Sequence, residues 1–61
     1  MKIDQRIKQV LESTEAALEL MEIEKDNLGI VKDLGNVIRN NNKTLISLNK
    51  VRLALAKYKN I

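Results

Sequence analysis

The sequence contains no cysteine, histidine, proline, tryptophan or phenylalanine, and Tyr58 is its only aromatic residue. Disulfides are therefore excluded, and the commonest zinc sites lose their ligands. Gly29 and Gly35 are the only helix-breaking residues, whereas a β fold needs many more turn residues. These absences predict an all-α fold whose apolar surfaces are aliphatic.

The chain has 61 residues, enough for one domain whose core supplies only about 3 to 5 kcal/mol of stability. Hydrophobic residues make up 44% and charged residues 31%, a composition that folds. Association with another chain is the reinforcement that remains. No apolar run approaches the roughly 20 residues that span a bilayer, and residues 1–10 are too polar for a signal peptide. We therefore expect a cytoplasmic protein.

The first apolar stripe advances by alternating steps of four and three residues, which is typical of coiled-coil-like helices. It consists of Ile3, Ile7, Val10, Thr14, Ala17 and Met21, with Leu11 and Leu18 beside it. This pattern predicts a helix over about 3–25. Residues 26–29 offer both a helix cap and a terminator, although a helix that continues through Gly29 is the alternative.

A second amphipathic helix is predicted over 28–40, with Ile30, Val31, Leu34, Val37 and Ile38 on one face. Gly35 costs it about 1 kcal/mol relative to alanine, which is tolerable if a neighbouring helix packs closely there. The run 40–43 is three asparagines and a lysine, and predicts a loop. A third helix follows over 44–59, capped by Asn42 or Thr44, with a main stripe of Leu45, Leu48, Val51, Leu55 and Tyr58 and with Ile46 and Leu53 on another side.

The expected architecture is one helical domain over 1–61, an antiparallel hairpin or three-helix unit with coiled-coil-like packing, completed by oligomerisation. Copies are expected to pair through an apolar stripe made of Ile7, Val10, Leu18, Met21, Val31, Leu34, Ile38, Leu48, Val51 and Leu55.

Charge is distributed unevenly along the chain. Residues 1–26 carry four basic and seven acidic side chains, whereas residues 27–61 carry seven basic and one acidic. One acidic ridge consists of Glu12, Glu15, Glu19, Glu22 and Asp26, and one basic ridge of Lys43, Lys50 and Lys57. Like charges three or four residues apart repel one another on a helix. Antiparallel packing is expected to bring the two ridges together and to cancel this repulsion, and the alternative is that both are ordinary solvated helix faces.

An enzyme is not expected, because the remaining candidates for catalysis are carboxylates, lysines, Ser13, Ser47 and Tyr58, none of them in a known motif. No cofactor and no metal is expected either, because the glutamates lie off the apolar stripe. Met21 is interpreted as core filling. A membrane-surface role lacks the Trp or Phe anchors that such helices use.

The leading interpretation is a non-enzymatic protein-interaction module, a small oligomeric adaptor or regulator that acts by burying an amphipathic helix. Its expected partners are further copies of itself and a larger protein target. The abundance of Asn, Lys and Ile fits an AT-rich genome, and very short helical regulators are frequent in phages and plasmids.

The alternative is a small nucleic-acid-binding regulator that uses the basic C-terminal helix. The basic residues of this part are Lys32, Arg39, Lys43, Lys50, Arg52, Lys57 and Lys59. Three features count against it: these residues are expected to spread around the helices, aromatic residues are lacking, and the acidic half would oppose a polyanion.

Overall fold

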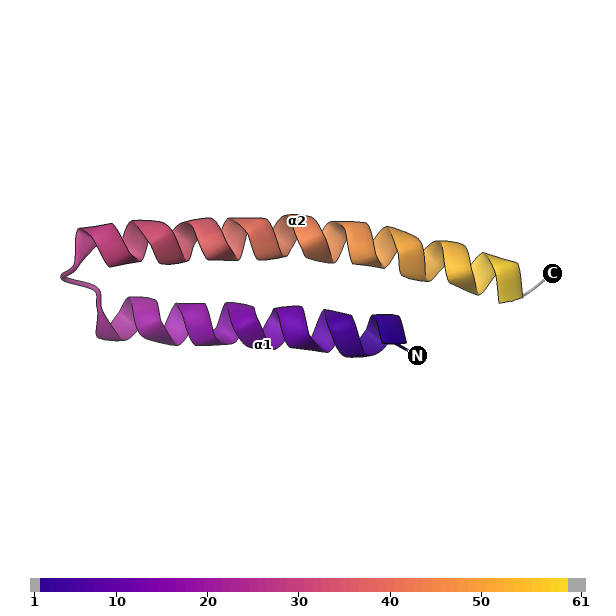
Figure 1. Cartoon of the computed structure of the whole chain (residues 1–61), viewed down its shortest axis with the longest axis horizontal. Helices are drawn as coiled ribbons and strands as arrows, with labels where there is room; N and C mark the ends of the chain where they lie inside the picture. The colour runs from indigo at the N-terminus through magenta and orange to yellow at the C-terminus, as the bar shows by residue number, and fades with distance from the viewer. Residues whose placement is uncertain (1, 60–61) are drawn as a thin grey trace.

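The protein is an antiparallel pair of helices in the computed structural model, which describes residues 2–59 (Figure 1). Helix α1 covers Lys2–Ile23 and helix α2 covers Leu28–Lys59. Met1, Asn60 and Ile61, which the predicted domain includes, lie outside the described residues, as does the side chain of Lys59. The pair is elongated, with dimensions of 53 × 15 × 11 Å. The fold is therefore the all-α hairpin, and not the three-helix unit.

The turn between the helices is made by residues 24–27, two residues earlier than predicted. Asn27 is the N-cap of α2, because its side-chain Oδ1 accepts a hydrogen bond of 3.2 Å from the backbone N–H of Ile30. Its backbone oxygen accepts the first helical bond, from Val31. Gly29 lies in the first turn of α2 and does not terminate a helix. The predicted cap is confirmed, and the predicted terminator is wrong.

A single line of contact, which we call the seam, joins the two helices. Its residues are buried or half-buried and consist of Ile3, Ile7, Val10, Thr14, Ala17 and Met21 on α1 and Val31, Leu34, Ile38, Asn41, Leu45 and Leu48 on α2. Both sets advance by steps of three and four residues, the spacing of antiparallel coiled coils. Among the described residues, Val10 and Ala17 alone are buried, each 4% exposed.

The loop predicted over 40–43 is wrong, because α2 is one continuous helix through these residues. Asn41 occupies a seam position, and its Nδ2 donates hydrogen bonds to Thr14 Oγ1 at 3.1 Å and Ser13 Oγ at 3.2 Å. Three asparagines cost a helix at most about 2 kcal/mol relative to alanine. Full burial of an aliphatic side chain contributes about 1.5 to 3 kcal/mol, so the half-buried Ile38 and Leu45 on either side of Asn41 together offset a cost of this size.

Thr14 and Asn41 also set how far one helix is displaced along the other. Counting outward from this pair places Val10 opposite Leu45 and Ala17 opposite Ile38, so the two buried residues flank the polar layer. The hydroxyl of Thr14 donates in turn to the carbonyl of Val10 at 3.1 Å. Every buried side-chain nitrogen or oxygen among the described residues has a partner.

Gly35 has no close neighbour in the hairpin. A Cβ atom built there would meet nothing within 4 Å beyond its own helix. The close helix contact that would account for a glycine in the middle of α2 is therefore absent from the single chain.

Candidate interaction surfaces

The seam already uses most of the predicted interaction stripe. Seven of its ten residues face the partner helix of the same chain: Ile7, Val10, Met21, Val31, Leu34, Ile38 and Leu48. Leu18, Val51 and Leu55 are exposed, and are the members of the stripe that remain available to another molecule. Twelve large hydrophobic side chains among the described residues are exposed in total.

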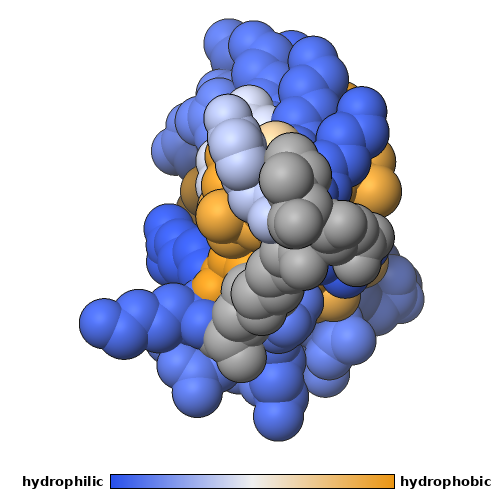
Figure 2. Space-filling model, turned by 90° about the vertical axis from the view of Figure 1, so that its right-hand side faces the viewer, coloured by the Kyte–Doolittle hydropathy of each residue, from blue (hydrophilic) through white to orange (hydrophobic). Residues whose placement is uncertain are grey.

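Eleven of these exposed side chains fall on the two sides of the hairpin, and the twelfth, Leu55, continues the seam line of α2 one heptad beyond Leu48. Viewed along the helices, hydrophilic residues cover the outer surfaces of both, and hydrophobic surface appears on either side of the pair (Figure 2). Because α2 runs opposite to α1, heptad positions of the same kind meet on each side of an antiparallel seam. Helix positions can therefore be assigned to one side or the other from the sequence.

One side, which we call the uncharged flank, carries a second stripe with steps of three and four residues on both helices. On α1 it consists of Gln9, Ser13, Ala16, Leu20 and Ile23, and on α2 of Val37, Asn40, Thr44, Ser47, Val51, Ala54 and Tyr58. Charged residues come only at its ends, at Lys2, Arg6 and Asp33. Ile30 extends its apolar line towards the turn.

The opposite side, which we call the charged flank, mixes apolar and ionic residues. Its apolar members are Leu11, Leu18, Leu28, Ile46 and Leu53, and its ionic members include Lys8, Glu15, Glu22, Lys25, Lys32 and Arg39. At one end Arg52 Nη1 lies 3.9 Å from Asp4 Oδ1, the one salt bridge within the described residues. Both side chains are about half exposed, so this pair adds little stability.

The two charge ridges do not meet within one chain, contrary to the expectation. They occupy the outer surfaces of the hairpin, with Glu12 and Glu19 on the back of α1, Asp26 following them in the turn, Glu15 and Glu22 between that back and the charged flank, and Lys43, Lys50 and Lys57 on the back of α2. All eight side chains are exposed. The seam faces in the opposite direction on each helix, so antiparallel packing separates the ridges instead of joining them.

The continuity of α2 changes the shape of the basic ridge. With 100° per residue, Lys32 and Arg39 fall in line with Lys43, Lys50 and Lys57, within an arc of about 40°. We call these five residues the basic back. The expectation that the basic residues spread around the helices is therefore wrong for five of them, and it depended on the incorrect break at 40–43. Arg52 lies elsewhere, beside Asp4.

Two features of these surfaces were missed from sequence. The Thr14–Asn41 layer could have been found by continuing the three-and-four stepping through Ile38, Asn41 and Leu45. The uncharged flank could have been found by asking which helix positions carry no charge at all.

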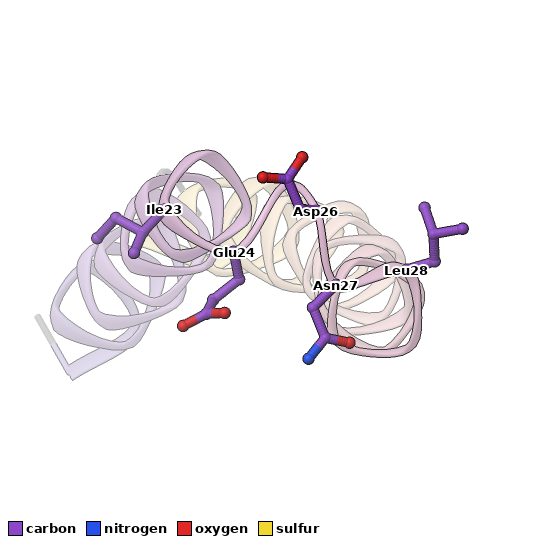
Figure 3. Close-up of a pocket in the computed structure, with 5 residues that line it drawn as sticks. All are labelled: Ile23, Glu24, Asp26, Asn27 and Leu28. Atoms are coloured by element: carbon purple, nitrogen blue, oxygen red, sulfur yellow. The ribbon is translucent and has the colours of Figure 1, made fainter.

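The turn forms an open depression lined by Ile23, Glu24, Asp26, Asn27 and Leu28. Their side chains point in different directions, with Ile23 and Leu28 on opposite sides (Figure 3). The groups needed to hold a small ligand therefore do not converge there.

Residues 2–59 contain no group of three or more Asp or Glu side chains placed so that they could hold a metal ion. Within the same range, neither helix is long and apolar enough to cross a membrane. Comparison with known protein families, curated proteins and solved structures finds no match to this chain.

Proposed function

We propose that this protein is a non-enzymatic, self-associating helical module, an oligomeric adaptor or small regulator in which two hairpins pack uncharged flank against uncharged flank. The product is a four-helix bundle. The observation that carries the proposal is the amount and kind of surface that a single hairpin leaves open.

A single hairpin is far from compact. Its radius of gyration is 14.9 Å, compared with about 10.5 Å for a globular chain of this length. Its accessible surface is 5093 Å², about 1,000 Å² more than a compact protein of its mass exposes. A standard protein interface covers roughly 800 Å² on each partner. The excess therefore matches what one copy would contribute to a dimer.

The uncharged flank is the side that can be buried at the lower cost. Between Gln9 and Ile23 on α1, and between Val37 and Tyr58 on α2, its stripe contains no ionisable group except the Tyr58 hydroxyl. Packing the charged flank instead would remove Glu15, Glu22, Lys32 and Arg39 from water, and each buried ion costs several kcal/mol unless it is paired. The small residues Ala16, Ser47 and Ala54 also let helices approach closely.

The test compares glutamate substitutions on the two flanks of α2. Val51 is 49% exposed and lies on the uncharged flank, while Leu53 is 62% exposed and lies on the charged flank. Light-scattering mass in line with size exclusion should give twice the 7.0 kDa chain mass for the wild type. Val51→Glu should reduce it to one chain mass, and Leu53→Glu should leave it unchanged.

Circular dichroism on the eluted peak completes the experiment. A wild-type protein that elutes as a fully helical monomer would show that one hairpin folds without a second copy and that the proposed self-association is wrong. A dimer disrupted by Leu53→Glu and not by Val51→Glu would keep self-association but move the interface to the charged flank.

A further inference from the structure

We propose that the basic back of α2 is a binding surface for the phosphate backbone of nucleic acids. This goes beyond self-association and does not depend on it, because the basic back faces away from both the seam and the uncharged flank. Its residues are Lys32, Arg39, Lys43, Lys50 and Lys57.

The five cations form a straight line. They recur at intervals of seven, four, seven and seven residues on one uninterrupted helix. At 1.5 Å per residue the line is about 38 Å long, with neighbouring charges about 6 to 10 Å apart. All five side chains are exposed. A linear array of one sign is suited to a linear polyanion.

Charges of the opposite sign are absent from this surface. Asp33 is the only acidic residue in α2, and it lies towards the uncharged flank. An ordinary solvated helix back mixes both signs, because acidic and basic neighbours three or four residues apart stabilise a helix. The basic back gives up that stabilisation along its whole length.

The acidic residues on the back of α1 lie too far away to oppose a polyanion on the C-terminal part of the basic back. Glu12, Glu19 and Asp26 are on the opposite outer face from Lys43, Lys50 and Lys57, and the Cα atoms alone span 15 Å across the pair. These side chains extend outward beyond that. Since the Debye length is about 8 Å at physiological ionic strength, a phosphate on Lys43, Lys50 and Lys57 is largely screened from those three carboxylates.

The chemistry favours nucleic acid over an anionic membrane. Helices that bind membrane surfaces insert a broad face of bulky apolar residues, commonly including Trp or Phe. Beside the basic back the large apolar residues of α2 are Leu28, Ile46 and Leu53, which are too few and too widely spaced along the helix for such a face. Lysine contacts to phosphate carry no base information, and aromatic rings for base stacking are absent here. The expected binding is therefore independent of sequence and sensitive to salt.

The experiment measures fluorescence anisotropy of a labelled mixed-sequence DNA duplex, and of one of its strands, titrated with the full chain at several salt concentrations. Each phosphate contact contributes about −0.9 to the slope of log affinity against log salt for duplex DNA. Lys43→Gln with Lys50→Gln and Lys57→Gln should reduce the slope by about 2.7. It should also weaken binding more than tenfold at low salt.

The matched control makes the same change in net charge away from α2, with Lys2→Gln and Lys8→Gln on α1 and Lys25→Gln in the turn. This variant should bind within about threefold of the wild type. An equal loss in both variants would show attraction by net charge alone and would overturn the proposal. Two other results would do the same: no binding to either DNA at low salt, or binding only to phosphatidylglycerol vesicles.

Light-scattering mass separates this result from the proposed self-association. Both lysine variants should keep the wild-type mass, because five of the six lysines lie outside the uncharged flank and Lys2 lies only at its end, where it is exposed. A monomeric wild type that still binds DNA through the basic back would overturn the bundle and leave this inference intact.

Discussion

Individual residues determine where α2 begins and where it is weakest. Asn27 supplies the N-cap, so the helix starts at Leu28 with one of its free N–H groups satisfied by a side chain. Gly35 is the weak point, because it adds backbone freedom in the middle of the helix without making room for a close neighbour in the hairpin.

Gly35→Ala should therefore stabilise the protein by about 1 kcal/mol per chain, since alanine is the better helix former and its methyl group meets empty space. Urea unfolding followed by circular dichroism measures this. Gly29→Ala is the matched control and should gain less, because it lies in the first turn and not in the helix interior, although its added Cβ would make only an ordinary contact with Asn27 at 3.6 Å. If Gly35→Ala were less stable than the wild type, the added methyl group would be meeting a helix of another copy packed on the charged flank.

At the scale of elements, the polar layer between Thr14 and Asn41 selects one register of α1 against α2. Polar residues at seam positions specify register at a cost in stability. Asn41→Leu should thus raise the free energy of unfolding by about 1 kcal/mol or more, because it adds apolar burial. Thr14 keeps its bond to the Val10 carbonyl, so no buried group is left without a partner.

Because Asn41→Leu removes the polar layer that selects one register, the helices should pair in more than one way. This should appear as broader elution and more than one mass in light scattering. Asn41→Ala is the comparison, and it should lower stability because it removes two hydrogen bonds without adding a side chain. If Asn41→Leu were less stable than the wild type, the amide bonds would contribute more than apolar burial can replace.

The elements also show which parts of the fold follow from sequence. The stripe from Ile3 to Met21 and the start of α2 at Leu28 were predictable, because apolar spacing and a capping asparagine are local signals. The helix through 40–43 was not, because asparagine favours turns locally, and that preference is reversed by packing of Ile38 and Leu45 in the seam and by contact of Asn41 with Ser13 and Thr14. The incorrect prediction of a loop over 40–43 is also why the basic back was missed, since Lys32 and Arg39 align with Lys43 only on a continuous helix.

At the scale of the whole molecule, two buried residues form too small a core for an independent domain. If assembly supplies the missing burial, folding and association are one reaction, and the melting temperature must depend on protein concentration. A hundredfold increase in concentration favours the folded dimer by about 2.7 kcal/mol. With an unfolding entropy of about 2.1 cal/mol/K per residue in two chains, this raises the melting temperature by roughly 10 °C.

Circular dichroism melts at protein concentrations from micromolar upward measure this shift. The Leu53→Glu variant should show the same shift, whereas Val51→Glu should melt at a lower temperature at every concentration. A melting temperature independent of concentration would mean that the seam alone holds the hairpin together.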